Sequence, residues 1–117
     1  MRWTAILLIL TACGAGDFGP QSRGIGGSCV SDGDCERTCI HSNSFPRGMC
    51  TTVCATDSDC PSGSPCVADP WGGGFLCAVP CDTNSDCIGF GAGYRCESFS
   101  KPHYGGPEER ANVCAVP

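Results

Sequence analysis

Cysteine is the feature of this sequence that most constrains its fold. The chain of 117 residues contains 13 cysteines, and all but Cys13 lie between Cys29 and Cys114. Large apolar side chains are scarce, because Val, Ile, Leu and Phe make up about 14% of the residues from Cys13 onward, below the ~20% under which chains tend toward disorder. So few apolar groups cannot offset the entropy of ordering the backbone. The sequence therefore predicts a small disulfide-rich, loop-dominated fold formed in an oxidising compartment.

The cysteines from Cys29 onward form three units of four with a recurring spacing. Five residues separate the first two cysteines of every unit, and three residues follow its last cysteine. The second gap runs three, five and eight residues, and the third runs ten, ten and seventeen. Such repeats predict a quasi-linear array of short modules, each with a short hairpin and a single helical turn. The expected modules are repeat 1 (29–53), repeat 2 (54–80) and repeat 3 (81–117).

The five-residue spacer that opens each unit has the pattern Cys-x-[Ser/Thr]-[Asp/Asn]-[Gly/Ser]-Asp-Cys. A hydroxyl residue three positions before an acid is typical of a capping box, here ending at Asp34, Asp59 or Asp86. The spacer therefore predicts one capped helical turn. Calcium is the competing interpretation, but each spacer offers only two or three acids or amides, whereas Ca²⁺ takes six to eight oxygen ligands.

Within each unit, we expect the first cysteine to pair with the third and the second with the fourth. Insertions are tolerated where a loop can bulge without moving both ends of a bridge, and interlaced pairing leaves the variable gaps free to bulge. A nested pairing through Cys35–Cys39 and bridges between units at Cys50–Cys54 or Cys77–Cys81 remain open alternatives. The expected pairs are Cys29–Cys39, Cys35–Cys50, Cys54–Cys66, Cys60–Cys77, Cys81–Cys96 and Cys87–Cys114.

Zinc is the main rival use for so many cysteines. Three-residue gaps such as Cys35–Cys39 fit the ligand spacing of structural zinc sites. Repeat 3 has no such gap inside it, however, and an oxidising compartment opposes thiolate–metal sites. We therefore expect neither a metal nor a cofactor.

The N-terminus predicts export. A positive Met1-Arg2 precedes the almost wholly apolar run Trp3–Ala12, which is too short for a membrane-spanning helix of about 20 residues. Such a run is typical of a signal peptide, here residues 1–12. Cys13 follows at once and is the odd cysteine that the paired units leave over. Residues 13–28 are rich in glycine and are expected to form a flexible tether.

Two resemblances add to this interpretation. Leu10-Thr11-Ala12-Cys13 resembles the lipobox of bacterial lipoproteins, which implies cleavage before Cys13, lipid attachment to Cys13 and, with Gly14 next, an outer-membrane location. The spacer pattern and the cysteines that follow resemble the Dickkopf N-terminal-type cysteine-rich repeat over about Gly27 to Pro117. Similar tandem repeats occur in bacterial lipoproteins. Repeat 1, with a three-residue second gap, and repeat 3, with Asn84 and a long last loop, depart from that pattern.

Enzyme chemistry and nucleic-acid binding find no support in the sequence. No Cys-x-x-Cys pair is present, and the only histidines, His41 and His103, stand in polar or Gly-Pro stretches with no motif of a catalytic nucleophile nearby. Asp and Glu number 12 against 7 Lys and Arg, and this acidic balance disfavours binding to phosphate backbones. We expect no enzyme activity and no nucleic-acid partner.

Interaction with another molecule is the function that remains. Aromatic and histidine side chains in Gly-rich loops can anchor a partner, although we favour their use as a minimal core over the disulfides. We expect an exported, lipid-anchored surface or periplasmic protein with a binding or structural role, attached to the membrane by its lipid and facing an unidentified protein or glycan. The alternative is a secreted inhibitor-like module that blocks a protease or receptor. The candidate interaction residues are Phe45, Trp71, Phe75, His103 and Tyr104.

Overall fold

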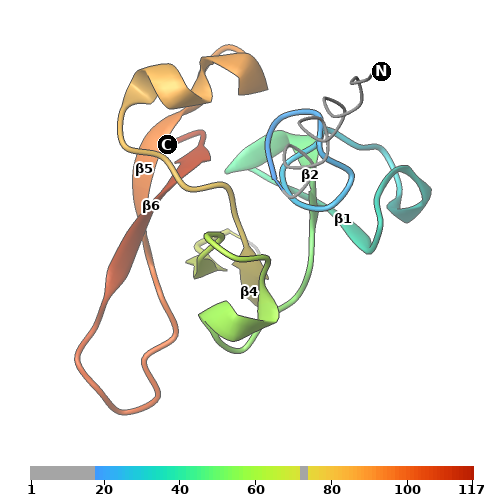
Figure 1. The fold of residues 1–117 in the computed structure, drawn as a ribbon. Helices are drawn as coiled ribbons and strands as arrows, with labels where there is room; N and C mark the ends of the chain where they lie inside the picture. The colour runs from blue at the N-terminus through green and yellow to red at the C-terminus, as the bar shows by residue number, and fades with distance from the viewer. Residues whose placement is uncertain (1–17, 72–73) are drawn as a thin grey trace, which may run out of the picture.

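Three antiparallel hairpins, one in each four-cysteine unit, make up the regular structure (Figure 1). A computed structural model describes residues 18–71 and 74–117. These parts confirm the expected small, disulfide-rich, loop-dominated fold. None of their helices is long and apolar enough to cross a membrane. The strands are β1 (Thr38–Ser42) with β2 (Phe45–Thr51), β3 (Cys66–Asp69) with β4 (Gly74–Cys77), and β5 (Arg95–Ser100) with β6 (Arg110–Ala115).

Each hairpin is preceded by a short 3-10 helix that begins in the spacer between the first two cysteines of the unit and, in repeat 3, continues past Cys87 to Phe90. These helices are η1 (Asp32–Asp34), η2 (Asp57–Asp59) and η3 (Asn84–Phe90). The third and fourth cysteines of each unit stand directly opposite each other in the hairpin, as Cys66 and Cys77 do in β3 and β4. The helical turn thereby brings the first two cysteines over the end of the hairpin where the other two lie.

The connectors that precede repeats 2 and 3 pair with the hairpins of those repeats through isolated bridges, Val53 with Leu76 and Pro80 with Val113. In repeat 2, the Cys77 N–H donates to the Thr52 carbonyl oxygen at 3.1 Å, and the Cys54 N–H donates to Phe75 at 3.3 Å. In repeat 3, the Cys114 N–H donates in the same way to Val79 at 3.0 Å. Main-chain hydrogen bonds therefore hold both connectors against the hairpins that follow them.

Gly26 and Gly27, in the described part of the predicted tether, make similar main-chain hydrogen bonds to repeat 1, so this part of the segment is ordered. The Cys50 N–H donates to the Gly27 carbonyl oxygen at 2.8 Å, as Cys77 does to Thr52. Ile25 is only 1% exposed and pairs with Phe18 in a parallel bridge. The glycine content suggested flexibility, but Gly26 and Gly27 are needed because any added Cβ would lie within 2.6 Å of neighbouring atoms.

The three units pack around one core, and the expected quasi-linear arrangement is therefore wrong. Phe45 of repeat 1 packs against Phe99 of repeat 3, with ring centroids 6.2 Å apart. The Val116 N–H donates to the Ser44 carbonyl oxygen at 2.9 Å, which joins the last residues of repeat 3 to the turn of repeat 1. The core draws on every unit and on the preceding segment; its largest members include Ile25, Phe45, Met49, Val67, Leu76, Phe90, Tyr94, Phe99 and Val113.

Candidate functional site

Six disulfides hold the framework, and every cysteine in the described residues takes part in one. The bonds join the first cysteine of each unit to the third and the second to the fourth. They are the six pairs that the spacing predicts, and neither the nested nor the between-unit pairing forms in the described chain. Cys13, the predicted lipid site, lies outside the described residues.

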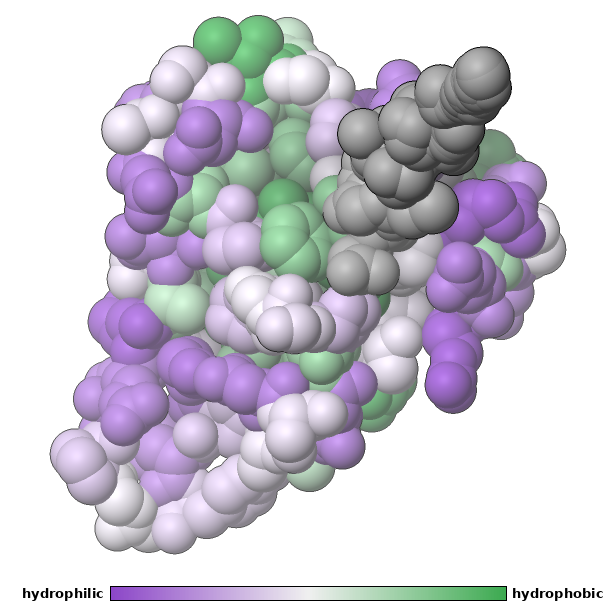
Figure 2. Space-filling view, viewed as in Figure 1, coloured by the Kyte–Doolittle hydropathy of each residue, from purple (hydrophilic) through white to green (hydrophobic). Residues whose placement is uncertain are grey.

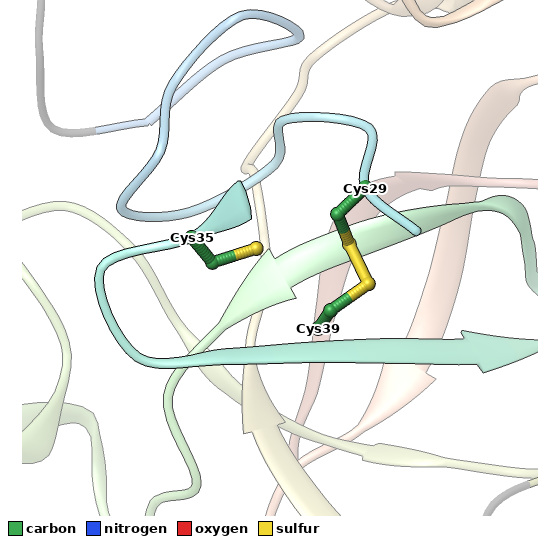
Figure 3. A group of neighbouring side chains, drawn as sticks. All are labelled: Cys29, Cys35 and Cys39. Atoms are coloured by element: carbon green, nitrogen blue, oxygen red, sulfur yellow. A yellow bond between two sulfur atoms is a disulfide. The ribbon is translucent and has the colours of Figure 1, made fainter. Parts of the chain in front are cut away.

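The two disulfides of each unit lie side by side. The sulfurs of Cys29, Cys35 and Cys39 are all within 4.8 Å of one another, and Figure 3 shows the Cys29–Cys39 bond next to the Cys35 sulfur. Three sulfurs gather in the same way in each of the other units. All of these sulfurs are bonded to another sulfur, whereas a metal cage needs free thiolates. The three clusters are therefore pairs of structural disulfides.

The acid that ends each spacer caps its 3-10 helix, which confirms the predicted capping boxes. One oxygen of Asp59 accepts the N–H of Ala55 at 2.7 Å and that of Thr56 at 3.2 Å. Asp34 and Asp86 accept equivalent bonds. These backbone hydrogen bonds to the charged form lower the pKa of all three carboxyl groups.

The middle residue of the spacer has a role that the sequence analysis missed. Its side-chain oxygen accepts the N–H of the third cysteine of the unit. The distances are 2.9 Å for Asp32 to Cys39, 2.8 Å for Asp57 to Cys66 and 3.0 Å for Asn84 to Cys96. The available signal was the restriction of this position to Asp or Asn. The middle residue and the last acid of the spacer thus both bind the main chain.

Phe45 is not an interaction residue, and that expectation is corrected. It is 1% exposed and belongs to strand β2, where its ring packs against Phe99 in the shared core. The Pro46-Arg47-Gly48 run that follows it suggested a loop. The chain instead continues as strand β2 through this run. Gly48 has a φ of 78° and lies so close to the Cys29 carbonyl group that a side chain would not fit there.

Three of the predicted interaction residues meet in one place. Phe75, His103 and Tyr104 line a cavity of about 400 Å³ between the β3–β4 hairpin and residues 101–109, the long loop of repeat 3. Ser100 and Lys101 complete the polar part of its lining. We call this the repeat 2–3 cavity. Trp71, on the turn between β3 and β4, is 60% exposed but is not part of the lining.

Polar contacts fix the long loop of repeat 3 against repeat 2. The Tyr104 hydroxyl donates to the Ala55 carbonyl oxygen at 2.8 Å, although 71% of the tyrosine remains exposed. The Lys101 ammonium lies 2.5 Å from a carboxylate oxygen of Asp57. Burial raises the pKa of Asp57, but the hydrogen bonds from the Cys66 N–H and Lys101 and the lysine charge together lower it. The cavity thus has one wall from each of two units.

A second anchor holds the two strands at the base of that loop. Glu108 accepts the Ser100 hydroxyl at 2.6 Å and lies 3.0 Å from the Arg110 guanidinium. The Ser100 hydrogen bond, followed by those from Arg110 and the charges of Arg110 and His103, lowers the pKa of Glu108. The loop therefore presents His103 and Tyr104 from an ordered base.

In comparisons with known proteins, no family model, no curated protein and no solved structure matches this chain.

Proposed function

We propose that this protein is an exported, lipid-anchored binding protein that contacts its partner at the repeat 2–3 cavity. The exported character follows from the structure, because six disulfides in so small a domain are typical of non-cytoplasmic proteins. The observation that carries the binding role is the grouping of Phe75, His103 and Tyr104 around one cavity. Exposed aromatic side chains on an ordered loop are the usual anchors of an interface.

The partner that fits this surface is a protein or a glycan. The aromatic rings can stack on a flat group, and the neighbouring lysine and histidine can donate hydrogen bonds to it. The two histidines support binding rather than catalysis. His41 lies with Nε2 3.1 Å from the Cys29 carbonyl oxygen, and exposed His103 is at the cavity. We therefore propose no enzyme activity.

Lipid attachment at Cys13 is part of the same proposal. It is supported by the apolar run before Leu10-Thr11-Ala12-Cys13 and by the pairing of the other 12 cysteines, which leaves Cys13 as the odd one. If the mature N-terminus proves unlipidated and the protein is found in the medium, the secreted inhibitor-like alternative replaces this proposal.

Site-specific photocrosslinking in cells tests the binding role. A photoreactive phenylalanine analogue replaces His103 in one variant and Val30 in a control. Val30 is 85% exposed and belongs to the first unit, away from the cavity lining. A discrete adduct that forms from position 103 but not from position 30 supports the proposal. Identical adducts from both positions, or none from position 103, would overturn it.

A further inference from the structure

The segment next to the expected lipid site is fixed to the folded domain from Phe18 onward. The Gly19 N–H donates to the Ile25 carbonyl oxygen at 2.9 Å, and Phe18 bridges to Ile25. The Phe18 ring lies 3.5 Å from the place where a Cβ on Gly63 of repeat 2 would stand. Pro20 lies 3.3 Å from the equivalent place on Gly89 of repeat 3. The segment therefore rests against two units.

The short length of the chain before Phe18 limits how far the domain can move from a lipid on Cys13. Only residues 14–17 separate the two positions. Five residue steps at ~3.3–3.6 Å each span at most about 18 Å. Anchored acyl chains hold their cysteine at the bilayer interface. Phe18 and the surface around it must then stay within about that distance of the lipid headgroups.

The surface around this point exposes apolar side chains. Ile88 of η3 is 70% exposed and is next in sequence to Gly89, the residue in contact with Pro20. Phe18 and Pro20 are partly exposed and line a shallow hollow with Arg23 and Glu36, whose opposite charges offset each other. The Arg23 guanidinium donates to the carbonyl oxygens of Asp34 and Gly33 at 3.0 and 3.4 Å, so the apolar side chains carry the contact. Exposed apolar atoms at the end of the molecule that η3 forms are visible at the top of Figure 2.

We infer that the face formed by Phe18, Pro20 and Ile88 lies against the phospholipid headgroups. We call it the membrane-facing surface. This inference rests on the proposed lipidation of Cys13. Apolar side chains held within reach of a lipid anchor suit a phospholipid surface, where the exposed isoleucine enters the interface. The repeat 2–3 cavity is then held at a fixed height above the bilayer instead of moving on a long tether.

Tryptophan fluorescence distinguishes close contact from loose tethering. The chain has two tryptophans, Trp3 in the expected signal peptide and Trp71. The lipidated protein is reconstituted into vesicles of phosphatidylethanolamine and phosphatidylglycerol that contain a lipid with a nitroxide quencher on its headgroup. The test protein carries Ile88→Trp and Trp71→Phe, and the unmodified protein, with Trp71 at the tip of the β3–β4 hairpin, is the control.

We expect the quencher to reduce the Ile88→Trp emission about twofold more than that of Trp71, because only position 88 lies at the interface. Insertion of a long Gly-Ser segment between Gly16 and Asp17 should abolish that difference while the protein still sediments with the vesicles. Equal quenching at both positions in a protein that sediments would overturn the inference and leave the anchor intact. Failure to sediment, with an unlipidated N-terminus by mass spectrometry, would instead overturn the proposed function on which the inference rests.

Discussion

At the scale of single residues, the spacer side chains bind the main chain in two ways. The last acid accepts two N–H groups at the start of the 3-10 helix, and the middle residue accepts the N–H of the third cysteine. Asn84 makes the second contact as well as Asp32 does, at 3.0 and 2.9 Å, so that contact requires an oxygen but no charge. Charged acceptors form stronger bonds to several donors, which explains an acid at the capping position.

Substitution by asparagine should therefore affect the two positions unequally. Asp59→Asn removes a charge that two N–H groups share, and we expect it to lower the melting temperature. Asp32→Asn keeps the oxygen that Cys39 uses and should lower it less. Thermal unfolding with the disulfides intact measures both. A larger effect at Asp32, or a rise in melting temperature on adding calcium, would contradict the assignment of these residues to main-chain bonding.

Acid should weaken the fold through the same carboxyl groups. Backbone hydrogen bonds lower the pKa of Asp34, Asp59 and Asp86 in the folded chain. A group with a lowered folded pKa stabilises the fold above its unfolded value of about 3.9, and this contribution is lost as pH falls through the folded pKa. We expect a steady melting temperature between about pH 7 and 5 and a decline below about pH 4. Asp59→Asn should make the decline shallower; an unchanged slope would contradict the cause given.

At the scale of elements, the hairpins and capped turns followed from the sequence, but the pairing of the connectors did not. The repeated cysteine units predicted the hairpins, and the repeated Ser/Thr-to-Asp interval predicted the helical turns. Connector residues such as Thr52 and Val79 pair through only one or two main-chain hydrogen bonds. Such short pairing leaves no alternation of apolar and polar side chains by which the sequence could reveal it.

Two glycines in left-handed conformations provide a matched test of the close approach in repeat 1. Gly48 has a φ of 78° and Gly105 has a φ of 88°. Alanine at either position should cost about 1–2 kcal/mol of backbone strain. Gly48→Ala should cost more, because its Cβ would stand 2.2 Å from the Cys29 carbonyl oxygen, whereas nothing lies within 4 Å at Gly105. Denaturant unfolding measures both, and equal losses would show that Cys29 moves away freely.

At the scale of the whole molecule, disulfides and a thin shared core act together. The disulfide pairing was predictable because the constant and variable gaps show which loops can change length. The shared core was not, because contacts such as Phe45 with Phe99 join residues far apart in the chain that local spacing cannot relate. The binding cavity was predictable only in part. His103 and Tyr104 were identified, but their meeting with Phe75 depends on how repeats 2 and 3 pack.

The loss of stability on replacing an aromatic residue should depend on how deeply its side chain is buried. Phe45→Ala removes a ring that is 1% exposed and should cost about 3–5 kcal/mol of the free energy of unfolding. Trp71→Ala alters a side chain that is 60% exposed and should change stability by about 0.5 kcal/mol or less. Chemical denaturation of the two variants provides the comparison. A stable Phe45→Ala protein would show that the three units do not depend on their common core.

Thiol labelling should show that all cysteines of the three repeats are in disulfides. Alkylation of the unreduced protein should label none of the 12 cysteines of the repeats, because each is in a disulfide. Reduction should then unfold the chain, since each bridge over a loop of about 15 residues contributes roughly 3 kcal/mol in the chain-entropy model. Mass spectrometry counts the labels and circular dichroism follows the fold. More than one labelled thiol per unreduced chain would contradict this framework.

The hydrogen-bonded connectors limit where this chain can evolve. A three-residue connector must reach from the last cysteine of one unit to the hairpin of the next, so an insertion there would disturb both units. The five-residue spacer is equally fixed, because its two ends are joined by its own capping acid. Growth is left to the second gap of each unit, which runs from three to eight residues, and to the hairpin end, where the seventeen-residue gap of repeat 3 places its extra length at residues 101–109. New specificities can thus arise by lengthening one loop while every disulfide stays in register.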